Sequence, residues 1–180
     1  MVLLQTGDRI CASCGGMNGQ HGLACTGDES VEVISVYTRQ QAIEDGILVD
    51  CEQAPMGEMR SQVMKWPLAI TATTFHRYVW PIDEDANLPP GQSLEGRFWD
   101  VVWMFRAAVK GSLPSRCISP CVLLFDFYCI VDGPALWPNE TIDATARSGP
   151  DGMRLVTLKA VSGPGDEGEP VMTFMLPEED

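Results

Sequence analysis

The fold is decided by the stretch Met153-Arg-Leu-Val-Thr-Leu-Lys-Ala-Val161, Ser162-Gly-Pro-Gly-Asp-Glu-Gly-Glu169, Pro170-Val-Met-Thr-Phe-Met-Leu176. Its two outer segments are rich in Val, Leu, Thr and Phe and have the length of β-strands. The middle segment consists of Gly, Pro, Ser and acidic residues, which favour turns. The stretch therefore predicts a long-looped antiparallel hairpin over 153–176.

A long helix is predicted over residues 94–110, where apolar residues recur at the spacing of one helix face and Gly111 supplies the stop. Trp99 and Trp103 lie four residues apart on a neighbouring face, so the helix is apolar over more than one stripe. We therefore expect this helix to pack on two sides or to contact a partner. The main apolar stripe consists of Leu94, Phe98, Val101, Val102, Phe105 and Val109.

Two short helices are predicted earlier in the chain. Thr38 and Gln41 have the spacing of a capping box, which predicts a helix over 38–45. A second short helix is expected to begin at Thr71 or Thr73 and to end before the proline that follows it. Both helices are too short to be stable alone, so we expect them to pack on the sheet.

These elements predict one α+β domain over residues 31–180. Its mainly antiparallel sheet of three or more strands includes a buried strand at 121–131 and is packed against one long and two short helices. Residues 132–152 have turn-forming prolines and glycines at both ends, which predicts a surface loop. Residues 1–30 show no periodic apolar face and are expected to be a separate, small N-terminal appendage.

The appendage contains the ligand set of a zinc site. Cys11, Cys14, His21 and Cys25 provide three thiolates and one imidazole, the donors of a closed tetrahedral Zn²⁺ site, at a spacing close to that of a zinc knuckle. The glycines between them allow the tight turns that such a short loop needs. Because four protein ligands leave no open coordination position, the predicted zinc is structural. The alternative is an appendage that binds no metal.

Charge argues against nucleic acid as a partner. The chain has 25 acidic and 12 basic residues, a net charge of -13, which repels phosphate backbones. Between Cys11 and Cys25 there is no Lys, Arg, Phe, Tyr or Trp to contact phosphates or to stack on bases. A protein partner is therefore expected. Its candidate contacts are the tryptophans of the long helix and the acidic hairpin loop, namely Trp99, Trp103, Asp166, Glu167 and Glu169.

The remaining cysteines and the second histidine carry weaker signals. The favoured interpretation is that Cys51, Cys117, Cys121 and Cys129 are small buried apolar residues, since free cysteine is among the most buried residue types. The alternative is a second metal site or a thiol nucleophile. His76 is expected on the side or surface of a helix, with a role as general base as the alternative.

A cytoplasmic location is expected. The longest apolar runs fall far short of the roughly 20 residues that a membrane span needs. The first residues lack the basic and long apolar segments of a secretory signal. In a reducing compartment the seven cysteines are expected to be free thiols or metal ligands and not disulfides.

Two stretches, Ile34-Ser-Val-Tyr-Thr-Arg-Gln-Gln-Ala-Ile-Glu-Asp-Gly-Ile-Leu-Val-Asp50 and Gly96-Arg-Phe-Trp-Asp-Val-Val-Trp-Met104, stand out together with 155–159 and 163–177. Over residues 31–180 the chain resembles an uncharacterised domain family of bacterial plasmid and phage proteins. The Cys/Cys/His/Cys segment looks like an addition to that domain. The resemblance implies an accessory protein of a mobile element, working in the cytoplasm of a bacterium, and implies no reaction.

The sequence is compatible with three functions. The favoured one is a noncatalytic, acidic interaction protein that binds a protein encoded by the host or by the element. The first alternative is a zinc-dependent nucleic-acid-binding or regulatory module. The second is an enzyme of unrecognised type that uses His76, a free cysteine or the acidic loops.

Elemental analysis tests the zinc prediction. Protein purified without chelator is expected to contain about one Zn²⁺ per chain, because the four ligands form one closed site. A Cys14→Ser, Cys25→Ser variant is expected to contain none. Zinc-free wild-type protein would contradict the prediction.

Overall fold

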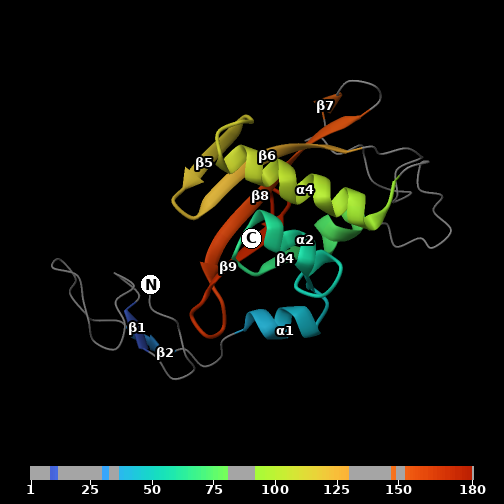
Figure 1. Ribbon diagram of the computed structural model, residues 1–180. Coiled ribbons are helices and arrows are strands. Elements are labelled where there is room, and N and C mark those ends of the chain that lie inside the picture. Colours follow the sequence, from blue (N-terminus) through green and yellow to red (C-terminus); the bar gives the residue numbers. More distant parts are fainter. Residues whose placement is uncertain are drawn as a thin grey trace, which may run out of the picture.

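The computed structural model describes residues 9–11, 30–32, 37–80, 92–129, 147–148 and 153–179. The chain is α+β, as predicted (Figure 1). Its elements in chain order are β1 (Arg9–Cys11), β2 (Ser30–Glu32), α1 (Arg39–Glu44), β3 (Leu48–Asp50), α2 (Met56–Val63), β4 (Leu68–Thr71), α3 (Ala72–Thr74), the π-helical turn η1 (Phe75–Val79), α4 (Leu94–Val109), β5 (Ser115–Ser119), β6 (Val122–Cys129), β7 (Arg147–Ser148), β8 (Arg154–Pro164) and β9 (Pro170–Met175).

The main sheet has the strand order β3-β4-β9-β8-β6-β5, and β7 pairs with the first residues of β8. The strand pairs are antiparallel except β4 with β9, which is parallel, so the sheet is mixed but mainly antiparallel. The sequence pattern did not reveal the parallel pair, because its two strands are about a hundred residues apart in the chain. β1 and β2 form a separate two-stranded antiparallel sheet.

The predicted hairpin is present as β8 and β9, with registers running from Lys159 opposite Met175 to Pro164 opposite Pro170. β8 extends three residues beyond the predicted Val161, and the connecting loop is correspondingly shorter. Gly168 has φ of 87°, a left-handed conformation that glycine adopts without strain. Alternate residues of β8, namely Val156, Leu158 and Ala160, are buried, as expected for a strand with one face on the core.

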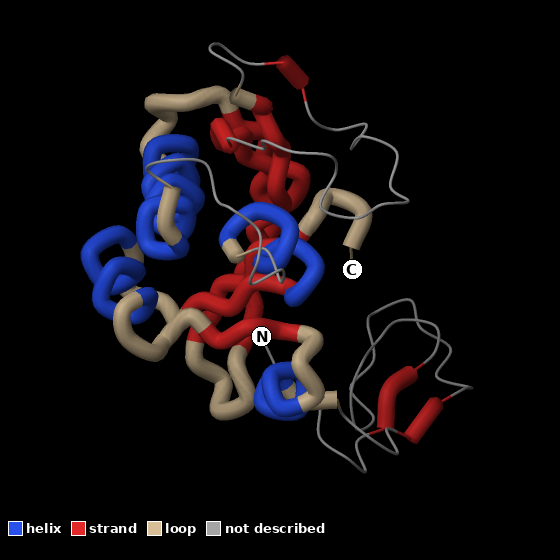
Figure 2. The backbone as a smooth tube through the Cα atoms, turned by 90° about the vertical axis from the view of Figure 1, so that its right-hand side faces the viewer, coloured by secondary structure: helices blue, strands red, loops and turns tan. Residues whose placement is uncertain are grey.

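The helices α2 and α4 lie on one side of the sheet, which Figure 2 shows close to edge-on. Three rings hold α4 to the strands: Phe105 of α4 contacts Phe125 of β6 and Phe174 of β9, with ring centroids 4.9 to 5.4 Å apart. Phe125 and Phe174 are fully buried, and burial of one such side chain contributes roughly 1.5–3 kcal/mol. Further along the same face, Tyr78 of η1 meets Phe127 edge-to-face.

The helix boundaries follow the predicted caps. Thr38 and Gln41 form the reciprocal capping box at the start of α1. The Thr71 side chain accepts a hydrogen bond from the Thr74 amide and so starts α3, which continues into η1 and ends at Trp80, before the next proline. The Ser93 side chain caps α4, and Gly111 follows its end with φ of 73°. α2 is a further short helix, in addition to the two that the sequence predicts.

Two strands correct the sequence-based prediction. β5 was not predicted, because its residues Ser115–Ser119 are exposed or half-buried and show no apolar alternation. β7 lies within residues 132–152, which were expected to form a surface loop throughout. Its pairing with Arg154 and Leu155 comes from the position of β8, which no local pattern encodes.

One carboxylate joins α1 to the hairpin loop. Asp166 accepts hydrogen bonds from the backbone amides of Arg39 and Gln40, each at 2.8 Å. The capping box satisfies the next amide, that of Gln41, and the amide of Thr38. Asp166 therefore satisfies the two first-turn amides that the helix's own side chains leave.

Replacing this carboxylate tests the link. Asp166→Ala is expected to lower the free energy of unfolding by about 1 kcal/mol, the usual effect of removing a helix cap, because two amides lose their acceptor. Glu167→Ala, at the neighbouring exposed position, is the matched control and is expected to change stability little. Urea unfolding of both variants measures the difference. Equal stability of the two variants would contradict a capping role.

Candidate functional site

The exposed side of α4 carries a stripe of two tryptophans and two cations, Trp99, Trp103, Arg106 and Lys110, at helical spacing. We call it the tryptophan stripe. The indole rings of Trp99 and Trp103 are stacked, with centroids 5.6 Å apart and planes 22° apart. Trp99 packs against the hydrophobic core, whereas Trp103 is 49% exposed. The inner ring thus supports an outer ring that faces solvent.

Arg106 fixes the stripe to the neighbouring helix. Its guanidinium donates two hydrogen bonds of 3.0 Å to the carbonyls of Gln62 and Val63 at the end of α2. It also lies 5.9 Å from the centroid of the Trp103 ring, within reach of a cation–π contact. The two carbonyls at the end of α2 and the indole ring of Trp103 therefore hold this guanidinium in one position. Lys110, one turn further, is exposed.

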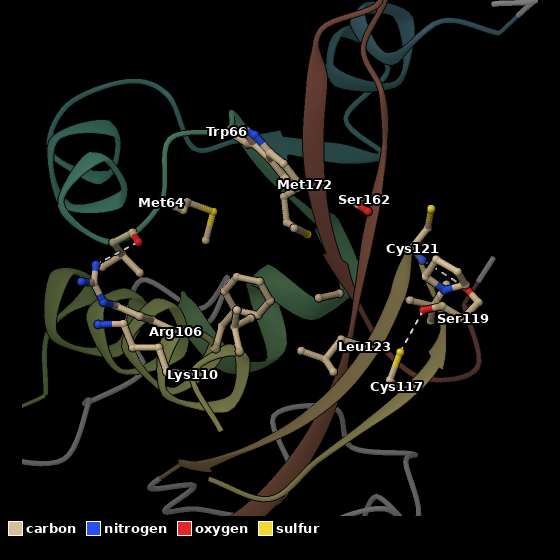
Figure 3. Close-up of a pocket in the computed structure, with 16 residues that line it drawn as sticks. Met64, Trp66, Arg106, Lys110, Cys117, Ser119, Cys121, Leu123, Ser162 and Met172 are labelled. Carbon is tan, nitrogen blue, oxygen red and sulfur yellow. Dashed lines mark hydrogen bonds between the residues drawn. The ribbon is translucent and has the colours of Figure 1, made fainter. Parts of the chain in front are cut away.

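An apolar groove begins where the stripe ends (Figure 3). It has a volume of about 480 Å³ and lies between α4, the segment after α2, the β5–β6 hairpin and the sheet. Leu123, Ala160 and Met172, all on the helix-covered face of the sheet, line it from the strands. The other lining residues are Val63, Met64, Trp66, Phe105, Arg106, Val109, Lys110, Cys117, Ser119, Pro120, Cys121, Val122 and Ser162.

The charged side chains that line the groove are all basic. Arg106 and Lys110 line the wall formed by α4, and none of the residues found to line the groove is acidic. Acidic residues outnumber basic ones two to one in the whole chain, 25 against 12, so this cationic wall runs against the overall charge. Two methionines, Met64 and Met172, add flexible side chains that adapt to different shapes.

The cysteines divide into two classes. Cys51 and Cys129 are buried, as expected, and burial raises the pKa of both thiols. Cys117 and Cys121 are exposed, so the expectation that they are buried is wrong. Cys117 lies in β5, at the edge of the main sheet, and Cys121 lies in the turn between β5 and β6. Both line the groove.

The acidic hairpin loop lies away from the tryptophan stripe. In Figures 1 and 2 it lies beside α1 at the lower end of the sheet, while α4 crosses the upper part. Asp166 caps α1, and the Glu169 carboxylate accepts the amide of Glu167 at 3.0 Å. The five predicted partner contacts therefore form two separate surfaces. In the loop surface, the carboxylates of Asp166 and Glu169 already accept hydrogen bonds from backbone amides.

The structure describes one of the four predicted zinc ligands, and it also describes His76. Cys11 lies in β1, opposite Ser30 of β2, and Cys14, His21 and Cys25 lie outside the described residues. Among the described residues no group of three or more potential ligands gathers. Nδ1 of His76 lies 3.2 Å from the carbonyl oxygen of Trp80, and its ring packs edge-on against Phe75.

Comparison with known proteins finds no match: no family model, no curated protein and no solved structure resembles the chain significantly. Within the described part of the chain, no helix has the length and apolar character to cross a membrane.

Thiol labelling tests the two classes of cysteine. Iodoacetamide at pH 8 is expected to modify Cys117 and Cys121 in the folded protein, because they are exposed. Cys51 and Cys129 are expected to react only after denaturation, since burial shields them and raises the pKa of each thiol. Peptide mass spectrometry assigns each site. Rapid labelling of Cys51 would contradict the buried position.

Proposed function

We propose that the protein is a noncatalytic interaction protein that binds a protein partner through the tryptophan stripe of α4. The supporting observation is the stacked pair in which core-packed Trp99 carries the half-exposed Trp103. An exposed indole in a fixed orientation can enter a partner's pocket with little loss of conformational entropy. Trp and Arg are also the residues most enriched among energetic hot spots of protein interfaces.

The positive charge of the tryptophan stripe indicates the chemistry of the partner surface. Arg106 lies beside Trp103 with its position fixed by the carbonyls of α2, and Lys110 continues the stripe. A partner surface with an apolar pocket next to a carboxylate is complementary to this arrangement. The remaining acidic surface of the chain repels other acidic proteins, which makes recognition depend on the local pairing.

The wider setting of the proposal comes from the sequence. We extend the proposal to a role as accessory protein of a bacterial mobile element, with a partner encoded by the host or by the element, on the basis of the stretches at 34–50 and 96–104. The proposed location is the cytoplasm, and the Cys11–Cys25 segment is proposed to be a zinc-stapled appendage. Net charge of -13 supports a protein partner over nucleic acid.

Copurification with two tryptophan variants tests the proposal. The partner recovered with the wild-type chain is identified, purified and titrated against each variant. Trp103→Ala is expected to weaken its Kd by about 30-fold, the equivalent of a hot spot of roughly 2 kcal/mol. Trp80→Ala is the matched control, because Trp80 is 39% exposed and lies outside α4; its Kd is expected to be unchanged.

Thermal unfolding of the same variants separates binding from folding. Trp103→Ala is expected to melt close to the wild type, because half of its side chain is already in solvent. Trp99→Ala is expected to be destabilised, because Trp99 packs against the core. Equal Kd values for Trp103→Ala and the wild type would refute the role of the stripe.

A further inference from the structure

The groove beside α4 has the dimensions of a small-ligand site. Its volume of about 480 Å³ falls within the roughly 300–1,000 Å³ of typical ligand pockets. Four parts of the chain surround it, and Figure 3 shows Met64, Trp66, Leu123 and Met172 around the space between helix and sheet. An apolar molecule there would leave water and contact several elements at once.

The lining favours a hydrocarbon chain over a polypeptide segment. A peptide brings N–H and C=O groups, and each costs free energy when it loses water without gaining a hydrogen bond. Most strand residues that line the groove, Leu123, Ala160 and Met172 among them, present carbon and sulfur, and Ser119 and Ser162 each add one hydroxyl group. A hydrocarbon chain carries no polar group that such a surface leaves unsatisfied.

The charge of the groove selects one kind of head group. Arg106 and Lys110 form its cationic wall, and none of the lining residues found is acidic. The guanidinium of Arg106 is already held in place by α2, and Figure 3 shows the ammonium of Lys110 beside it, so the two cations mark one end of the groove. An anionic group at this wall gains attraction from both, in a chain whose net charge of -13 repels anions elsewhere.

We propose that the groove binds a single-chain aliphatic carboxylate, with the hydrocarbon chain between α4 and the sheet and the carboxylate at Lys110 and Arg106. Met64 and Met172 adjust to the chain, since their unbranched side chains adopt many shapes. The ligand site shares Arg106 and Lys110 with the tryptophan stripe but not Trp103, which does not line the groove. It is measured on the purified chain alone, so its outcome is independent of any partner.

Titration with sodium dodecanoate, below the concentration at which it forms micelles, tests the proposal. Calorimetry is expected to show one molecule bound per chain, and Trp66, which lines the groove, is expected to change its fluorescence. Decanoate, shorter by two methylene groups, is expected to bind about fifteenfold more weakly, because each buried methylene contributes about fourfold. Dodecyltrimethylammonium, with the same chain and the opposite charge, is expected to bind more weakly than dodecanoate.

The cationic probe distinguishes the proposed site from nonspecific electrostatic binding. Nonspecific attraction to a chain of net charge -13 predicts that the cation binds more tightly than the anion. The proposal predicts the reverse order. Binding of the two head groups with equal affinity, or tighter binding of the cation, would overturn the proposal.

Matched variants locate the site. Lys110→Glu is expected to weaken dodecanoate binding about fivefold, whereas Arg116→Glu, the same charge change on β5 outside the groove, is expected to have no effect. Ser162→Phe fills the groove and is expected to abolish binding. Val109→Glu, at a rim position that is 61% exposed and therefore tolerant of change, is expected to weaken binding at least tenfold without unfolding the protein. Wild-type affinity in the folded Val109→Glu variant would overturn the proposed location.

Discussion

The contact of Phe105 with Phe125 and Phe174 is the constraint on which the other features depend. These three rings join α4, β6 and β9, which are the helix and two of the strands that build the core. They hold α4 over the middle of the sheet, against β9 and β6. The tryptophan stripe is left on the outer side of α4, and the groove opens beneath its end. Both candidate surfaces are consequences of one packing arrangement.

Several acidic side chains stabilise the fold by accepting hydrogen bonds from neighbouring elements. The carboxylate of Glu52 accepts the amide of Leu68 and pairs with Arg60, which joins α2 to β4. The carboxylate of Glu179 accepts hydrogen bonds from both hydroxyls of Thr71 and Thr74 and from the amide of Leu176. Together with the capping of α1 by Asp166, these contacts tie short elements to the sheet. A count of charges therefore overstates how many acids are available to a partner.

The sequence predicts what local chemistry determines. Capping residues marked the starts of α1 and α3, apolar periodicity marked α4, and strand-forming residues on either side of a turn segment marked the β8–β9 hairpin. It missed β5, whose side chains are mostly exposed, and the parallel pairing of β4 with β9, which only the assembled sheet defines. The groove was missed for the same reason: its residues come from six helices and strands and from the connections between them, and no segment carries more than part of the pattern. In the sequence, the signal for the groove was the pair of cysteines Cys117 and Cys121. Because free cysteine is usually buried, the sequence favoured a buried position for both, whereas the structure exposes them.

The parallel pairing of β4 with β9 also sets an order for biosynthesis. β3 and β4 can pair with each other soon after they are made, but the next strand in the sheet begins at Pro170. Until that segment leaves the ribosome, the apolar face of Leu68 and Ile70 has no strand beside it and stays available to chaperones or to other nascent chains. Long separations of this kind slow folding, because a large loop must close before the contacts form. The core is therefore completed only after residues 170–175 have been translated.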